Sequence, residues 1–534
     1  MSHFSGNEKS HDEFLSKKAY FSNKIGLSYA MIRYIVLFLT LISLNSCRIL
    51  STGTPQPKRE FRGVWIATVV NIDWPKNGND SSEKQKADYL EILKFYKDLN
   101  YNAVIVQVRA AGDAFYPSEY VPWSRFLSGT EGKRPDWEED TLTWMIREAH
   151  KNGMEFHAWF NPYRATFDLR TDILSPAHDY FTHPEWMLKY GKKYYYNPGL
   201  PEVRDKFSII IAEVVSRYDI DAVHFDDYFY PYKIKGETLK DTPAYSDYRL
   251  EGQSLEDWRR SNIDSLVKNV SKTIKTIKPW VRFGISPFGV WKNKTTDPRG
   301  SDTKAGQTTY EDLYADPLLW MEKGWVDYIA PQVYWSMDLP VASHHKIMDW
   351  WSNNSKNTHL YIGNGAYKIR NNSDVAWERK KELPDQIKLA RQTREVSGNI
   401  LFSAKSLMDK NPDVASYLKR KYYKFPALPP VSPHIEKEIP NLVQVVPITK
   451  NNDSIQLKAR GLTNLKNMLV YKSGKKVKAE YSNKKMLAKI AIEKSSDIIT
   501  IPTAIIRGKR FAITFLDNYG RETQPIVLHL NKIP

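Results

Sequence analysis

Two adjacent aspartates, Asp226 and Asp227, stand at the end of an apolar stretch that begins at Asp221. Neighbouring carboxylates repel each other, which tends to leave a protonated acid beside an ionised partner. Hydrolysis of a glycosidic bond requires one carboxyl group that donates a proton and a second one that acts as a carboxylate. Residues 221–231 therefore predict a strand that carries a sugar-cleaving pair, although either aspartate could instead cap the loop or orient an arginine.

Acids, amides, arginines and aromatic residues also follow the other apolar runs. In a parallel barrel such residues converge on one mouth, at the carboxyl ends of the strands. The expected substrate-binding set is Asp73, Trp74, Arg109, Asp113, Asn161, Tyr163, Arg164, His224, Tyr228, Trp291, Gln332, Tyr334 and Trp335.

Three types of contact are expected within this set. Arg109 and Arg164 would bind an anionic substituent through paired hydrogen bonds. The tryptophans would stack on sugar rings or pack in the barrel. His224 shares a strand face with Asp226 and is equally compatible with a hydrogen-bonded core histidine.

The sequence lacks the motifs of several other kinds of functional site. No histidine or cysteine spacing typical of a metal site is present, so no metal and no cofactor are predicted. Ser286 has no Gly-x-Ser-x-Gly setting, which argues against a serine hydrolase. No glycine-rich phosphate turn follows the first predicted strand, which argues against a nucleotide-binding sheet.

Eight apolar stretches alternate with helical patterns, which indicates a parallel α/β fold. The predicted strands are 62–69, 102–108, 155–160, 221–226, 282–287, 327–333, 359–363 and 399–403. Eight such units predict a TIM barrel over residues 59–424, with a doubly wound sheet as the alternative.

A different organisation follows the barrel. The proline-rich residues 425–438 predict a stiff linker. About seven short strands in residues 439–534 then predict a small all-β sandwich of the immunoglobulin or fibronectin type. This domain would bind glycan or act as a spacer, and its excess of Lys and Arg favours an anionic surface.

The N-terminal region resembles a bacterial lipoprotein signal. Basic Arg33, the apolar run 34–44 and Asn45-Ser46 precede Cys47, the only cysteine of the 534 residues. Residues 1–47 would be an extension and signal peptide with translation starting at Met1 or Met31, and Cys47 would be lipidated. The alternative is an uncleaved membrane anchor. A tether over 48–58 would then connect the protein to a bacterial membrane, on the outer membrane or its periplasmic face.

The net charge of +17 and the pI near 9.3 favour anionic partners. No helix-turn-helix, RNA-binding or zinc-finger signature is present, so nucleic acid is not an expected partner. A charged cell envelope as the partner would account for both the net positive charge and the lipoprotein-like signal.

Five motifs resemble the glycosyl hydrolase-like 10 family of bacterial envelope proteins. They are 61–68, 71–75, 160–164, 224–228 and 330–335, within a match over about Arg59 to Ser403. The resemblance implies a TIM barrel that cleaves glycosidic bonds, with peptidoglycan strands stripped of stem peptides as the substrate of characterised relatives.

The sequence does not determine the identity of the second catalytic group. Many barrel glycosidases carry an acid at the end of strand seven, but residues 360–368 contain none. Asp227, Asp113, Asp73 and Asp338 are candidates, and so is assistance by an N-acetyl group of the substrate. A non-catalytic glycan-binding lipoprotein and a hydrolase of dietary or capsular polysaccharide are the alternative functions.

Overall fold

The computed structural model describes residues 56–355, 357–433, 435, 443–461, 464–474, 478–493, 496–506 and 508–534. Residues 55–534 form one compact unit with hydrophobic cores of its own, separate from residues 1–54. A unit of this kind can fold without the segment that precedes it. The predicted lipidation site Cys47, most of the tether and residues 436–438 of the linker lie outside the described residues.

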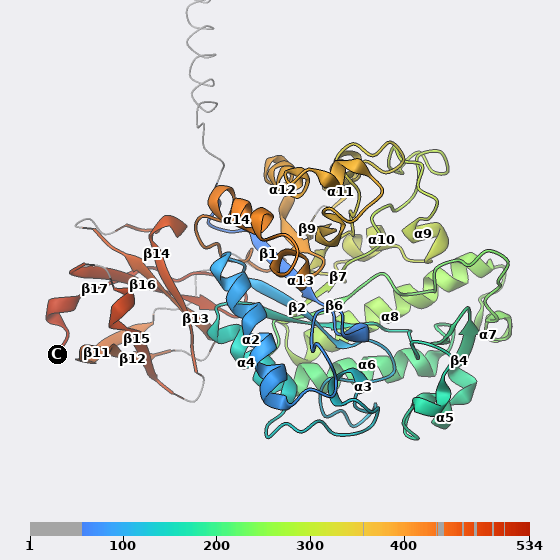
Figure 1. Cartoon of the computed structure of the whole chain (residues 1–534), viewed down its shortest axis with the longest axis horizontal. Coiled ribbons are helices and arrows are strands. Elements are labelled where there is room, and N and C mark those ends of the chain that lie inside the picture. Colours follow the sequence, from blue (N-terminus) through green and yellow to red (C-terminus); the bar gives the residue numbers. More distant parts are fainter. Residues whose placement is uncertain are drawn as a thin grey trace, which may run out of the picture. The chain divides into compact units, whose positions relative to one another are not determined.

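The first domain is a closed barrel of eight parallel strands, as the sequence predicts (Figure 1). Its strands are β1 (Phe61–Ile66), β2 (Ala103–Arg109), β3 (Glu155–Phe160), β6 (Ala222–Phe225), β7 (Arg282–Ile285), β8 (Tyr328–Ile329), β9 (His359–Asn364) and β10 (Val396–Leu401). They close in the order β1-β10-β9-β8-β7-β6-β3-β2. All eight predicted strands are present, but the sixth, predicted over 327–333, shortens to β8.

Helices surround the barrel and pack on the outer faces of its strands. The longer ones are α2 (Ser82–Asp98), α4 (Thr141–Lys151), α6 (Pro201–Arg217), α8 (Leu255–Ile277), α11 (His344–Asn354), α12 (Glu382–Gln392) and α14 (Pro412–Lys421). The shorter ones are α3 (Arg125–Ser128), α5 (Asp179–Thr182), α7 (Thr242–Tyr248), α9 (Thr309–Asp312), α10 (Pro317–Glu322) and α13 (Ala404–Met408). A hairpin of β4 (Met187–Tyr190) and β5 (Lys193–Tyr196), which the sequence pattern does not predict, follows β3.

The strand alternation separates two cores. Residues that point outward join the helices in the larger core, and those that point inward fill the barrel with a smaller one. Phe61, Trp65, Trp159 and Tyr328 belong to this inner core. The barrel is therefore filled, and its chemistry is confined to the carboxyl ends of the strands, called the mouth below.

The C-terminal domain consists of two antiparallel sheets that share one core. One sheet contains β11 (Gln444–Lys450), β12 (Ser454–Arg460) and β15 (Ile498–Pro502), and the other contains β14 (Met486–Ala491), β13 (Leu465–Lys472), β16 (Arg510–Asp517) and β17 (Ile526–His529). The fourth strand, β14, pairs with the third strand, β13. Immunoglobulin constant domains place their fourth strand in the sheet of the first two strands, so this strand order differs from theirs.

The sandwich contacts the amino ends of the barrel strands, called the floor below. Lys466 forms a short ion pair with Asp221 at the start of β6, and Lys489 Nζ donates to the Gly153 carbonyl at 3.2 Å. Arg59 Nη2 donates to the Gly520 carbonyl at 2.8 Å. The sandwich therefore lies at the end of the barrel opposite the mouth. No helix in the described part of the chain is long and apolar enough to cross a membrane.

Candidate active site

Asp226 and Asp227 directly follow β6 and are buried, with 4% and 2% of their surfaces exposed. Asp226 Oδ1 accepts a hydrogen bond from the Tyr228 amide at 3.1 Å, and the Tyr232 hydroxyl donates a short one to Asp227 Oδ2. Burial and the charge of Asp227 raise the pKa of Asp226 to about 7. Burial also raises the pKa of Asp227 to about 6, although hydrogen bonds from Tyr232 and Gln332 oppose the rise. The pair therefore holds a proton near neutral pH.

Arg164 lies beside this pair. Its guanidinium sits 4.3 Å from the centre of the Tyr228 ring, and its charge partly offsets the rise in the pKa of Asp226. Arg164 is 5% exposed, and its Nε has no hydrogen-bond acceptor among the described residues. An unsatisfied buried guanidinium N–H is costly, so a substrate oxygen is a suitable acceptor.

The residues after β8, which lies two strands from β6 in the barrel, contribute a neighbouring part of the mouth. Gln332 Nε2 donates to the Ser286 carbonyl at 2.9 Å. The half-buried Tyr334 stacks on Phe402 with 6.0 Å between ring centres. Trp335, also half-buried, meets Phe288 edge-on at 5.4 Å. Partly exposed aromatic rings near buried carboxyl groups suit the apolar faces of sugars.

Asn161 has an amide orientation that its neighbours determine. The backbone N–H groups of Thr68 and Val69 donate to Gln107 Oε1 at 3.1 and 2.9 Å. Gln107 must therefore present its nitrogen to Asn161 Oδ1, at 3.0 Å. Asn161 Nδ2 is left without a described acceptor, at the end of the strand next to that of Asp226. Asn161 is therefore a hydrogen-bond donor at the mouth.

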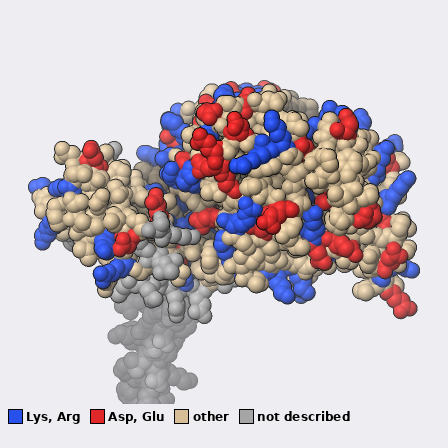
Figure 2. Space-filling model, turned by 90° about the horizontal axis from the view of Figure 1, so that it is seen from below, with Lys and Arg blue, Asp and Glu red and all other residues tan. Residues whose placement is uncertain are grey.

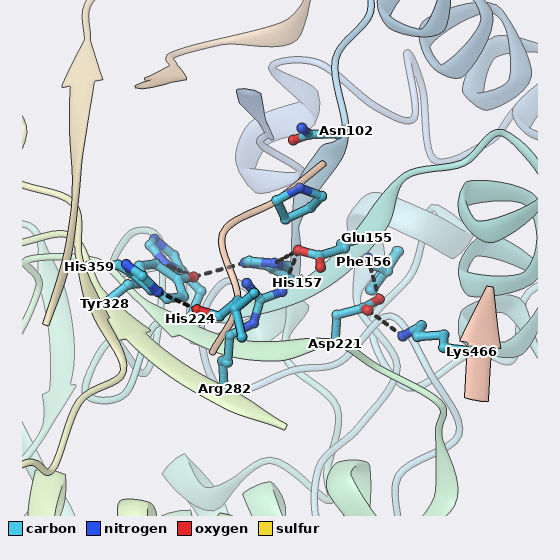
Figure 3. A network of polar contacts seen from close by, with 12 residues as sticks. Asn102, Glu155, Phe156, His157, Asp221, His224, Arg282, Tyr328, His359 and Lys466 are labelled. Carbon is cyan, nitrogen blue, oxygen red and sulfur yellow. Dashed lines mark hydrogen bonds and ion pairs between the residues drawn. The ribbon is translucent and has the colours of Figure 1, made fainter. Parts of the chain in front are cut away.

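His224 belongs to the barrel interior, in a chain of polar groups that Figure 3 shows. Trp65 Nε1 can only donate, and it lies 3.2 Å from His224 Nε2, so His224 carries its proton on Nδ1. His224 Nδ1 then donates to the Tyr328 hydroxyl at 2.9 Å, and that hydroxyl donates to His157 Nδ1 at 2.9 Å. His157 Nε2 consequently donates to Glu155 at 3.3 Å.

This chain has a consequence for the predicted role of His224. Both of its ring nitrogens are occupied within the barrel, and burial lowers its pKa well below the ordinary value. His224 is fully buried and neutral. The structure therefore places it below the mouth as a core histidine, which was the alternative interpretation of the sequence.

Two other predicted substrate contacts hold the loops of the mouth. Asp73 accepts hydrogen bonds from the Ala67 amide at 2.9 Å and from the Ser403 hydroxyl at 2.7 Å. Arg109 Nη1 donates to the Asn161 carbonyl at 2.6 Å. These contacts join loops that are distant in sequence. Like the Nε of Arg164, the buried Nε of Arg109 has no hydrogen-bond acceptor among the described residues.

Three predicted aromatic contacts lie within packed regions instead of at the mouth. Trp74 is fully buried and donates to the Gln85 carbonyl at 2.8 Å. Trp291 is 1% exposed and stacks on Trp350 with ring centres 5.7 Å apart. Tyr163 is 1% exposed within the outer core. Their ring faces are covered by protein and offer no surface to a sugar.

Asp113 pairs with a residue that the sequence pattern does not single out. Burial raises the pKa of Asp113, and burial together with the charge of Asp113 raises the pKa of Glu131 to about 8. Asp113 Oδ1 accepts from the Ala111 amide at 3.2 Å, and Glu131 accepts from the Ser175 amide at 3.0 Å. Asp113 therefore forms a second buried carboxyl pair with Glu131.

Two groups beside the aspartate pair stand outside the expected substrate-binding set. Tyr232 donates to Asp227, and the indole N–H of the buried Trp159 interacts with Asp226 and favours its ionised form. The signal for Tyr232 was available, because it lies five residues after Asp227 in the same aromatic run. Trp159 could have been placed by strand alternation with Asn161.

The acidic residues and histidines of the described part of the chain do not form a metal centre. Within the described residues, no group of three or more His, Cys, Asp or Glu side chains is arranged to hold a metal ion. On the face that Figure 2 shows, acidic and basic side chains are interspersed over the barrel.

Comparisons with known proteins identify the family of this chain. Glycosyl hydrolase YngK of Bacillus subtilis is 48% identical over 411 residues, which cover 76% of this chain and 80% of that protein. Glycosyl hydrolase DigH of Escherichia coli is 38% identical over 393 residues, covering 69% of this chain and 89% of that protein. The glycoside hydrolase domain of PgaB from Bordetella bronchiseptica superposes with a TM-score of 0.45 at 12% identity, covering 68% of this chain and 99% of that domain. Residues 60–379 match the glycosyl hydrolase-like 10 model, and the chain belongs to that family.

Proposed function

We propose that this protein cleaves glycosidic bonds in an amino-sugar glycan of the bacterial envelope, with Asp226 and Asp227 as the catalytic pair. The observation that carries the proposal is the buried pair of adjacent carboxyl groups at the mouth, with raised pKa values. Membership of the family supports the reaction class.

The environments of the two aspartates support different roles. Asp226 has the higher pKa and would keep its proton, so it would protonate the leaving oxygen as the general acid. Asp227 receives hydrogen bonds that favour its ionised form and would stabilise positive charge at the sugar carbon or activate its attacker. An acetamido group of the substrate could supply that attacker.

Peptidoglycan strands without stem peptides are the proposed substrate. The motifs that resemble the family and the lipoprotein-like signal before Cys47 support this choice. The free Nε–H of Arg164 suits a lactyl carboxylate, and Asn161 presents an N–H to an acetamido or hydroxyl oxygen. The proposed location is the cell envelope, with a lipid on Cys47 as the membrane anchor.

The test uses purified residues 48–534, which contain the compact unit. The protein is incubated with intact peptidoglycan and with peptidoglycan stripped by an amidase, and the products are identified by mass spectrometry. We expect oligosaccharides from the stripped substrate, and their loss in Asp226→Asn and Asp227→Asn. Asp98→Asn, at an exposed position on α2, is the matched control.

Each alternative has its own outcome in this assay. Binding to the glycan without any product would support the non-catalytic lipoprotein. Cleavage of capsular or dietary polysaccharides but not of peptidoglycan would change the substrate. Products that persist in both aspartate variants would refute the assignment of the pair.

A further inference from the structure

The positive charge of the protein is concentrated in its C-terminal sandwich. Residues 443–534 contain 17 Lys and Arg and 6 Asp and Glu, a net charge of +11 out of +17 for the whole chain. The other 442 residues therefore carry only +6. Such an asymmetry indicates an anionic partner for the smaller domain.

Four exposed lysines gather at one end of the sandwich: Lys450, Lys472, Lys509 and Lys532. Lys450 Nζ donates to the Leu530 carbonyl at 3.4 Å, and the Leu530 amide donates to the Lys509 carbonyl at 3.0 Å. These four residues are called the outer cationic end. Figure 2 shows Lys and Arg side chains along the outer edge of this domain, at the left of the view.

Strand register relates this end to the rest of the protein. Lys472 pairs with Phe511 at the start of β16, beside Lys509. Lys466, at the other end of β13, contacts the barrel floor. Figure 1 shows the chain's C-terminus, whose Pro534 carbonyl accepts from the Lys450 amide, at the outer side of the sandwich. Because the sandwich contacts the floor, a surface bound there would be separated from the mouth by the length of the barrel.

The position of the predicted lipid anchor indicates which polyanion the outer cationic end binds. Gln56 follows Cys47 by nine residues, which span at most about 30 Å when extended. The next residue, Pro57, accepts a hydrogen bond from Asn483 of the sandwich at 2.8 Å. A membrane that holds a lipid on Cys47 would therefore lie within reach of this domain.

The sandwich surface also favours lipid over glycan. The outer face of the β11-β12-β15 sheet exposes the aliphatic Val446 and Ile448, at 62% and 38%. On this face Val446 pairs with Lys458, whose Nζ also lies 3.4 Å from Asp497. Sugars are usually held on aromatic platforms, whereas aliphatic and cationic groups together suit a lipid surface.

We propose that the outer cationic end binds the head groups of anionic lipids. It is a second membrane contact beside the lipid on Cys47, and in this respect it rests on the proposed envelope location. With the membrane on this side, the mouth points toward the glycan instead of the bilayer.

The experiment measures sedimentation of residues 48–534, without a lipid on Cys47, with vesicles of phosphatidylcholine alone or mixed with phosphatidylglycerol. We expect binding only to the mixed vesicles, weakening with salt. Each lysine near an anionic surface contributes about fivefold, so replacing all four with Gln should weaken binding by several hundred-fold. The matched control replaces four exposed barrel lysines, Lys235, Lys268, Lys272 and Lys388, with Gln.

Three outcomes would overturn the proposal. The first is absence of binding to the mixed vesicles at moderate salt. The second is an equal loss in the control variant, which would show a response to net charge alone. The third is tighter binding to isolated peptidoglycan sacculi than to vesicles. No glycan is cleaved in this assay, so its result is separate from that of the proposed hydrolysis.

Discussion

Replacing Lys466 with Met tests whether the sandwich secures the strand that carries the catalytic pair. Lys466 and Asp221 form an ion pair with side-chain exposures of 19% and 5%. Removing one partner of a buried pair costs about 3–5 kcal/mol. Asp221 keeps hydrogen bonds from the Phe156 amide and His150, both at 2.8 Å. We therefore expect a smaller loss, about 2–3 kcal/mol in the free energy of unfolding.

The pH dependence of this loss follows from the same contacts. Burial alone would raise the pKa of Asp221, but Lys466 and His150 hold it well below its ordinary value. A depressed carboxyl pKa stabilises the fold above the unfolded value of about 4, and this stabilisation disappears as the pH falls through the folded value. The difference between the wild type and Lys466→Met should therefore be largest at neutral pH and shrink in acid.

Urea unfolding followed by circular dichroism measures both quantities. The matched variants are Asp221→Asn and the double variant, which together with Lys466→Met complete a double-mutant cycle. We expect a coupling energy above about 1 kcal/mol, because the single variants leave one buried charge unpaired. Additive effects with no pH dependence would refute the reasoning, since they would mean that the two charges do not interact.

Three further predictions concern the mouth and the barrel interior. The dependence of kcat/KM on pH should be bell-shaped, with limbs near the pKa values of about 6 and about 7 of the aspartate pair. In the inactive Asp227→Asn variant, an NMR titration should find the pKa of Asp226 lowered, because the charge that raises it is removed; an unchanged pKa would contradict the coupling of the pair. Tyr232→Phe should raise the pKa of Asp227 by about one unit and move the acidic limb upward, because a hydrogen bond to the ionised form is lost; an unmoved limb would contradict this role. His224→Ala should lower the free energy of unfolding by about 3 kcal/mol, since it leaves a cavity and a Tyr328 hydroxyl without its donor; unchanged stability with lost glycan binding would make His224 a substrate contact instead.

Local patterns were sufficient to predict the barrel. Each strand is a short apolar run next to a helical stripe, and both signals depend on residues that are close in sequence. The predicted ends of the strands were less accurate than the predicted number and order of the strands. Residues 327–333 look like one strand, yet β8 comprises only Tyr328 and Ile329. Pro331 has no backbone N–H to donate, and β8 gives way to two isolated bridges, which pair Gln332 with Phe288 and with Gly363.

The direction in which polar and aromatic residues face was harder to predict. Trp74 was a plausible sugar contact, but its ring packs between Tyr89 and Trp137 from helix α2 and a later loop. His224 shares a strand face with Asp226, yet it is bound by Trp65, which lies 159 residues earlier. Such contacts between distant residues leave no trace in local spacing.

The sequence by itself determined that a parallel barrel carries two adjacent aspartates at the end of its fourth strand. Strand alternation and apolar runs are properties of neighbouring residues, so they can be read along the chain. Only the tertiary structure decided that both aspartates are buried, that Tyr232 and Arg164 lie beside them, and that Asp73 and Arg109 form hydrogen bonds with loops of the mouth. The reason is physical: desolvation and electrostatic interactions depend on which groups surround a carboxyl group in space, and most of those groups are far away in the chain.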